Sequence, residues 1–261
     1  MTPTPHFTPT RVGALHHVEA GSGGTPLLLL HSTPRSCDEY AELLPLLAPG
    51  RRVLAMDTLG FGASPPLAEH SIEAYAAGAL ALLDALEIER VALLGHHTGG
   101  VVALELAACA PDRVERLVLS STPWTDAAFR RRRAGHPPID LVEVAEDGSH
   151  LTELWQRRQG FYPPGRPDLL TRFVRDALVL GADVERGHRA VGAYRMEERV
   201  GLVRCPVVLL GASADPYAFP DLEPLAEALG RPDVVVIDGG MVPLMESRAQ
   251  EVAVQVTRFL T

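Results

Sequence analysis

Residues 93–100, LLGHHTGG, decide the fold that this sequence predicts. The apolar residues before the first glycine read as a buried strand, and the three glycines are small enough to let a strand turn sharply into a helix. His97 stands in the middle of that turn, and histidine tolerates a positive φ better than bulky or β-branched residues do. The stretch therefore predicts a strand, a tight turn and a helix that begins at Thr98, with the side chain of His97 standing clear of the backbone.

Short apolar runs on both sides of this stretch predict further strands. Their apolar residues are continuous rather than alternating, which is typical of parallel strands covered on both faces. Helical patterns lie between them: Ser71 can cap one helix, and Ser247 and Gln250 have the spacing of a capping box before another. This alternation predicts an α/β fold with a doubly wound, mostly parallel sheet, whose ligands gather at the carboxyl ends of the strands. The six predicted strands are residues 25–32, 51–57, 90–96, 114–121, 206–212 and 233–239.

The alternation of strands and helices breaks between residues 123 and 199, where helical patterns continue without a clear strand. We expect this region to be a helical lid inserted into a core formed by residues 1–122 and 200–261. The first residues, with Pro3 and Pro5, are expected to be a loose tail.

Composition excludes several classes of function. The formal net charge of −9 opposes binding to nucleic acid, because an acidic surface repels phosphate groups. No apolar run reaches the length of a membrane span, and the N-terminus does not look like a secretory signal. All 24 Lys and Arg residues are arginines, which excludes mechanisms that need a Schiff-base or phosphate-binding lysine. The three cysteines are scattered, which is typical of reduced thiols in a cytoplasmic protein.

Five motifs, in order along nearly the whole chain, resemble the α/β-hydrolase family. That resemblance implies a nucleophile at position 97, a triad acid at Asp215 and a triad histidine at position 241. It also implies an oxyanion hole, to which we assign Thr33 and Thr98. The motifs are LLLLHSTPRS (27–36), MDTLGFGAS (56–64), LLGHHTGG (93–100), LLGASADPYAF (209–219) and IDGGMVPLMES (237–247).

The chain departs from this family at three of the positions that carry chemistry. His97 replaces the usual nucleophile, Met241 replaces the general base, and Ser32 replaces a small glycine. A serine triad needs a hydroxyl nucleophile, an imidazole and a carboxylate, so the usual mechanism is not available. Nucleophilic aspartate chemistry is excluded on the same ground.

We expect His97 and Asp215 to act as an acid–base pair joined by a water molecule, because a base can act through one water. Backbone N–H groups at the start of the helix at Thr98 are expected to stabilise an oxyanion. A sharper hypothesis makes Ser32 a relocated nucleophile within reach of His97. The alternatives are that His97 is a relic, that Ser32 only fills a loop position, and that Asp215 is a turn residue.

Further residues are expected to contact a substrate that is mostly apolar with a few polar groups. The arginines at 130–133 are interpreted as a solvated helix face, and no metal or cofactor is expected. The predicted substrate-binding residues are His31, Trp124, Trp155, Tyr162, His188 and Met241.

The sequence therefore predicts an enzyme of hydrolase or lyase type with a histidine-centred acid–base site. Its substrate would be a small, largely apolar carbonyl compound, ester or lactone. Two alternatives stay open: an inactive member of the fold that binds a small apolar ligand, and a scaffold protein. The expected partner is a small molecule rather than nucleic acid or membrane, in a cytoplasmic protein for which a homodimer is left open.

Overall fold

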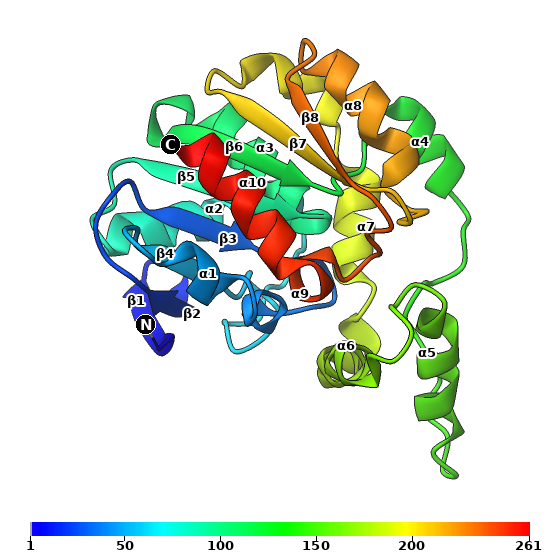
Figure 1. Cartoon of the computed structure of the whole chain (residues 1–261). Coiled ribbons are helices and arrows are strands. Elements are labelled where there is room, and N and C mark those ends of the chain that lie inside the picture. Colours follow the sequence, from blue (N-terminus) through cyan, green and yellow to red (C-terminus); the bar gives the residue numbers. More distant parts are fainter. Residues whose placement is uncertain (1) are drawn as a thin grey trace.

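An eight-stranded sheet forms the centre of the molecule in a computed structural model that describes residues 2–261 (Figure 1). Its strand order is β1-β2-β4-β3-β5-β6-β7-β8. The pairs β1–β2 and β2–β4 are antiparallel, and all later pairs are parallel. The mostly parallel sheet predicted from the apolar runs is therefore confirmed. The strands are β1 (Thr4–Thr10), β2 (Gly13–Ala20), β3 (Leu27–Leu30), β4 (Val53–Met56), β5 (Val91–His96), β6 (Val114–Ser120), β7 (Val207–Ala212) and β8 (Asp233–Ile237).

The prediction of a loose N-terminal tail is wrong. Residues 4–10 form the edge strand β1, which pairs along its length with β2. Proline is tolerated there because one side of an edge strand makes no ladder hydrogen bonds. The segment escaped prediction because β1 is mostly exposed and has no continuous apolar run.

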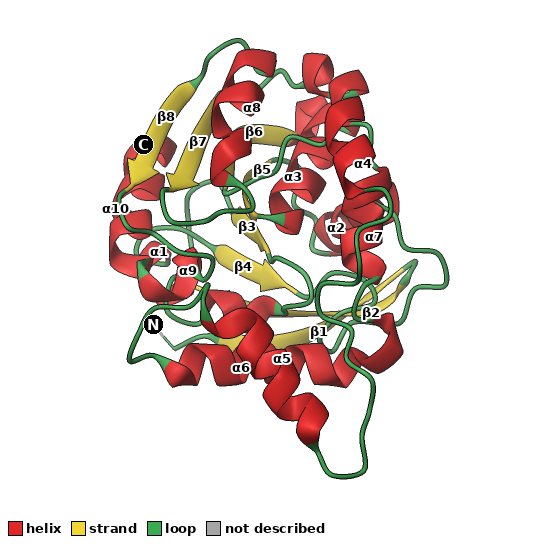
Figure 2. Cartoon of the chain, turned by 90° about the vertical axis from the view of Figure 1, so that its right-hand side faces the viewer, coloured by secondary structure: helices red, strands yellow, loops and turns green. Residues whose placement is uncertain are grey.

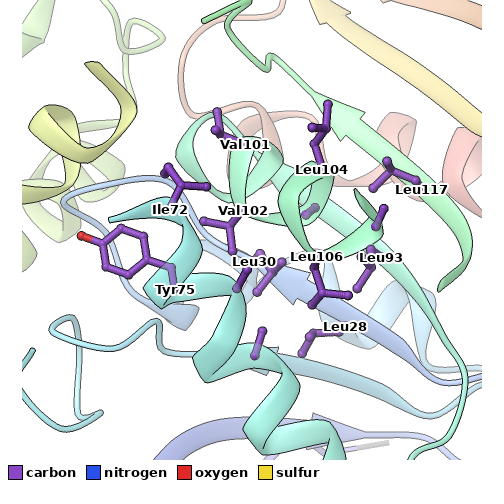
Figure 3. Close-up of a cluster of buried hydrophobic side chains, with 14 of the residues drawn as sticks. Leu28, Leu30, Ile72, Tyr75, Leu93, Val101, Val102, Leu104, Leu106 and Leu117 are labelled. Carbon is purple, nitrogen blue, oxygen red and sulfur yellow. The ribbon is translucent and has the colours of Figure 1, made fainter. Parts of the chain in front are cut away.

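Helices cover both faces of the sheet, and alternate residues of each buried strand point to opposite faces. On β3, Leu28 and Leu30 pack toward α2 and α3, whereas Leu27 and Leu29 pack toward α1 and α10. Figure 3 shows the first of these two clusters. The α-helices are α1 (Leu44–Leu47), α2 (Ile72–Ala85), α3 (Thr98–Cys109), α4 (Ala127–Arg133), α5 (Ser149–Gln159), α6 (Pro167–Leu180), α7 (Arg186–Ala193), α8 (Leu222–Ala228), α9 (Leu244–Ser247) and α10 (Ala249–Leu260).

The two helix caps predicted from the sequence have different outcomes. Ser71 caps α2, because its side chain accepts a hydrogen bond from the backbone N–H of Ala74 at 3.1 Å. Ser247 caps nothing. It ends α9 and its hydroxyl donates to the carbonyl of Pro243, so α10 begins without a side-chain cap.

A helical segment, called here the insert, joins β6 to β7 and spans residues 121–206. It carries α4 to α7, and the predicted lid (123–199) falls inside it. Helices α5 and α6 lie away from the sheet, beyond the carboxyl ends of its strands (Figures 1 and 2). They are held together by an apolar cluster of their own, so the insert has a small core separate from the sheet. Its role as a lid stays a prediction.

Ion pairs fasten the insert to the core. Arg35, in the loop after β3, contacts Asp176 of α6 at 2.9 Å, and Arg172 of α6 contacts Asp38 at 2.7 Å. Within residues 2–261, no helix is both long enough and apolar enough to cross a membrane.

Candidate active site

The turn at His97 has the backbone geometry of a strained strand–helix junction. His97 lies between β5 and α3 with φ 47° and ψ −114°. The turn needs glycine beside it, since a Cβ on Gly99 would collide with the backbone carbonyl of Leu30. The strand, the turn and the helix start at Thr98 agree with the sequence prediction, and strain of this kind is typical of functional sites.

His97 contacts Asp215 directly, not through the water expected from the sequence. Nε2 of His97 lies 2.8 Å from Oδ2 of Asp215. The two groups form an ion pair, although the ring N–H is not aligned for a linear hydrogen bond. The other carboxylate oxygen, Oδ1, accepts the backbone N–H of Tyr217 at 2.9 Å. The longer imidazole side chain spans the gap that a water was expected to fill.

The pair shifts the pKa of both partners. Burial disfavours the charged form of His97, but the charge of Asp215 outweighs it, so the pKa of His97 is raised above 6.5. Burial likewise opposes the charge on Asp215, yet the charge of His97 and the backbone N–H of Tyr217 lower the pKa of Asp215. The arrangement favours an imidazolium held by a carboxylate.

The second ring nitrogen of His97 is open. The His97 side chain is 16% exposed and lines a cavity of about 600 Å³. Within residues 2–261 its Nδ1 has no hydrogen-bond partner, and unlike Nε2 it is not sealed from the cavity. A histidine with Nε2 toward a carboxylate and Nδ1 toward a cavity can exchange a proton with a bound molecule.

The cavity lies between the strand ends and the insert. Its wall is mixed, with apolar and charged side chains from both parts. Lining residues from the core include Ser32, Thr33, Glu39, Thr98, Val242 and Pro243. Lining residues from the insert include Phe129, Ile139, Arg158, Tyr162, Phe173 and His188.

Thr33 and Thr98, the predicted oxyanion-hole residues, lie side by side at this cavity. Their hydroxyl oxygens are 2.8 Å apart. Within the described residues, neither backbone N–H donates a hydrogen bond to the protein. Two free N–H groups beside a cavity are suited to bind an oxyanion.

Ser32 does not form the expected dyad with His97. Its hydroxyl donates to Oε1 of Glu39 at 2.5 Å, and its backbone N–H donates to Oε2 at 2.9 Å. Although Glu39 is buried, which opposes its charge, the nearby charges of His96 and Arg35 and the hydrogen bonds from Ser32 lower its pKa. Ser32 is therefore bonded to Glu39 instead of to the imidazole of His97.

Four predicted substrate-binding residues do not line the cavity. His31 is buried and uses both ring nitrogens, because Nε2 accepts from Thr58 N–H at 3.0 Å and Nδ1 bonds the carbonyl of Ser32 at 2.7 Å. Trp124 packs against the sheet core and Trp155 against the cluster of the insert. Met241 is absent from the lining, although its neighbours Val242 and Pro243 belong to it. Of the six, Tyr162 and His188 line the cavity.

The sequence reasoning missed a group of buried charges at the cavity. Nη1 of Arg35 lies 3.0 Å from Oε1 of Glu246, and both residues line the cavity. Burial raises the pKa of Glu246 to about 7, even though Arg35 acts in the opposite direction. The sequence does show a charged residue, Arg35, shortly after His31, but the partner Glu246 lies far away along the chain.

Two clusters have donor sets of the kind that binds metal ions. They are His16, Cys37 and Asp57, and Asp140, Glu185 and His188, each with ligand atoms within 4.8 Å of one another. In both, the histidine already contacts the aspartate at 2.8 Å. Each set therefore has an internal ion pair in place of free ligand atoms.

Comparison with known proteins finds similar sequences among hydrolases. The sequence profile of the alpha/beta hydrolase fold matches residues 25–181. The chain is 39% identical over 112 residues to the 2-hydroxymuconate semialdehyde hydrolase of Pseudomonas sp. (strain CF600), a match over 41% of this chain and 40% of that protein. It is 28% identical over 232 residues to the 2-hydroxy-6-oxononadienedioate/2-hydroxy-6-oxononatrienedioate hydrolase of Paraburkholderia xenovorans (strain LB400), over 85% and 72% of the two chains.

The enol-lactonase of Burkholderia xenovorans LB400 has a similar structure. Its TM-score is 0.78 with 20% sequence identity, over 97% of this chain and 99% of that one. At this level of identity the likeness concerns the fold.

Proposed function

Because this chain belongs to the α/β-hydrolase fold family, we propose that it is a hydrolase in which His97 and Asp215 activate a water molecule. The water attacks the carbonyl carbon of a small, largely apolar substrate. The observation that carries this proposal is the orientation of His97, whose Nε2 contacts Asp215 while Nδ1 opens to the cavity.

In the proposed mechanism His97 begins neutral, with its proton on Nε2 toward Asp215. Nδ1 takes a proton from water, the remaining hydroxide bonds to the carbonyl carbon, and Asp215 stabilises the imidazolium that forms. The N–H groups of Thr33 and Thr98 bind the oxyanion. No serine nucleophile is needed, which fits the replacement of the nucleophile by His97.

Ser32 has a role in this proposal other than the nucleophile expected from the sequence. Its only hydroxyl proton goes to Glu39, so its oxygen can only accept hydrogen bonds from the cavity. Nδ1 of neutral His97 is also an acceptor. A water molecule held by both would donate one proton to each and present a lone pair to the carbonyl carbon.

The substrate class follows from the cavity and from the relatives. A volume of about 600 Å³ suits a small molecule, and its wall combines phenylalanine and proline with isolated polar groups. The named relatives are hydrolases of oxo-acids, and the similar structure is an enol-lactonase. We therefore propose esters, lactones or carbon–carbon bonds beside a ketone as the bonds that are hydrolysed.

The test is a substrate panel of aryl esters, simple lactones, enol lactones and vinylogous diketones, assayed with wild type, His97→Ala and the control His6→Ala. His6 is exposed on β1. We expect His97→Ala to lose about 10²–10⁴-fold in kcat, the range of general base catalysis, and His6→Ala to match wild type. Equal rates in all three proteins would overturn the proposal. Tight binding of panel members without turnover would favour a binding protein instead.

A further inference from the structure

The insert carries a second histidine–aspartate pair that faces the same cavity. Nε2 of His188 on α7 lies 2.8 Å from Oδ2 of Asp140, whose carboxylate is buried. Arg158 of α5 donates to both oxygens of Asp140, at 2.6 and 2.5 Å. The other ring nitrogen of His188 has no partner within residues 2–261, and His188 lines the cavity.

Helix α7 is packed directly against the oxyanion-hole residues. Gly187 precedes His188, and a Cβ at Gly187 would collide with the side chain of Thr33. Thr33 in turn contacts Thr98, the residue after His97. The absence of a side chain at position 187 therefore brings His188 close to the place where the carbonyl group would bind.

We propose that His188 is the general acid of the reaction and protonates the leaving group. This inference rests on the proposed hydrolase function. His97 takes a proton from water as the hydroxide bonds to the carbonyl carbon. When the tetrahedral intermediate collapses, the bond to the leaving group breaks, and the leaving atom keeps the electron pair and takes the proton from Nδ1 of His188. Solvent then returns a proton to His188 and removes one from His97.

The surroundings of His188 suit proton transfer better than metal binding. Both oxygens of Asp140 are occupied by Arg158, and Oε1 of Glu185 accepts the backbone N–H groups of Asp140 and Leu141. Arg158 therefore already occupies the carboxylate oxygens that a metal ion would need. Burial opposes the charge on Asp140, but His188 and Arg158 lower its pKa to about 2, which keeps the carboxylate ionised beside the ring.

Other basic groups also face His188. Arg133 and His136 line the main cavity and also a second hollow of about 380 Å³ that shares His188. Neither has an ion-pair partner among the described residues.

A general acid matters only for leaving groups that are strong bases. Alkoxides and carbanions need a proton as they leave, whereas a nitrophenolate does not. The proposal thus assigns alkyl esters, lactones or carbon–carbon bonds as substrates rather than activated esters alone.

The experiment measures kcat/KM for acetate esters with leaving groups from p-nitrophenol to simple alcohols. For His188→Gln we expect less than a twofold change with p-nitrophenyl ester and about a 100-fold loss with alkyl esters. His6→Gln, on the exposed edge strand β1, should match wild type throughout. Circular dichroism and binding of the product carboxylate check that each variant is folded.

The outcomes distinguish the general-acid role of His188 from the hydrolase function on which it rests. An equal loss across all leaving groups would make His188 a binding or structural residue, and no loss would give it no role. Either result would overturn the acid assignment while the His97→Ala result still stands. If wild type hydrolysed none of these esters and none of the lactones and diketones of the first panel, both the proposed function and this assignment would fail.

Discussion

The two histidine–aspartate pairs differ in how their carboxylates are stabilised. Asp215 belongs to the core, and the donors to its carboxylate are His97 and backbone N–H groups. Asp140 belongs to the insert and shares its charge between His188 and Arg158. The two pairs have the same distance between nitrogen and oxygen but opposite electrostatic surroundings.

This difference shows what a carboxylate does for a histidine beside it. Among the residues that the structure describes, no cation other than His97 contacts Asp215, so the charge of Asp215 acts mainly on His97 and raises the pKa of that ring. Asp140 is already neutralised by Arg158, so less of its charge is available to His188. The core pair is therefore arranged to stabilise an imidazolium, whereas the carboxylate of the insert pair is shared between His188 and Arg158.

Removing Arg158 should have the largest effect of these changes, on the free energy of unfolding. It takes away the cation that distinguishes the Asp140 pair from the Asp215 pair. Arg158→Met leaves Asp140 buried with one partner fewer, and losing one partner of a buried ion pair costs about 3–5 kcal/mol. Arg157→Met on the same helix is the control, because Arg157 is partly exposed and its loss should cost less than about 1 kcal/mol. Urea unfolding measures both free energies, and similar values for the two variants would contradict the distinction.

The change Asp215→Asn should have the second-largest effect, on the pKa of His97 and the pH dependence of kcat/KM. Without the carboxylate the imidazolium is less stable, so the pKa of His97 falls, and the rise of kcat/KM with pH moves to lower pH. NMR titration of the ring gives the pKa and steady-state rates give the pH profile. Asp140→Asn should leave this rise in place. If the rise of kcat/KM with pH moved by the same amount in Asp215→Asn and Asp140→Asn, the two histidine–aspartate pairs would not act independently.

The change Ser32→Ala tests whether Ser32 orients the water molecule that His97 activates. The variant loses the acceptor that orients water, with an expected fall in kcat of about tenfold, comparable to one hydrogen bond. Ser22→Ala, on an exposed turn, is the control. A change in KM with kcat unaffected would show that Ser32 binds substrate instead of orienting water.

The smallest effect is expected from rebuilding a serine triad. The double variant His97→Ser with Met241→His should gain weak hydrolysis of aryl esters and become labelled by a fluorophosphonate at position 97. Each single change should do far less, because triad residues act as a unit. The gain is limited because Met241 does not line the cavity in this structure. A folded double variant without labelling would contradict the equivalence of position 97 to the family's nucleophile.

Local features explain what could be predicted from the sequence. Five of the six predicted strands are buried and are continuous apolar runs, and the sixth, β8, is a mostly exposed edge strand that its valines still mark as a strand. The turn at His97 is marked by glycines within a few residues of it. The contact between His97 and Asp215 was predicted as a pair but not as a direct one, because the reach of an imidazole ring depends on the turn's final geometry.

Long-range polar contacts explain what could not be predicted. Arg35 meets Asp176 and Glu246, which are 141 and 211 residues away along the chain. No spacing or periodicity links such partners, so the charged side of the cavity was not predicted. The same reasoning applies to His188, whose carboxylate and arginine come from other parts of the insert.

The glycines around His97, where an added Cβ would collide with neighbouring atoms, have a consequence for protein engineering. A Cβ at Gly95, Gly99 or Gly100 would run into backbone or into Thr122, whereas the side chain at position 97 lines the cavity. Random mutagenesis of the turn should therefore yield unfolded protein at the glycines and folded protein at position 97. Within position 97, the β-branched residues should be under-represented because φ is positive. A library confined to this one codon would sample serine, cysteine, aspartate and asparagine on an unchanged scaffold, and so would compare several reaction chemistries in one cavity.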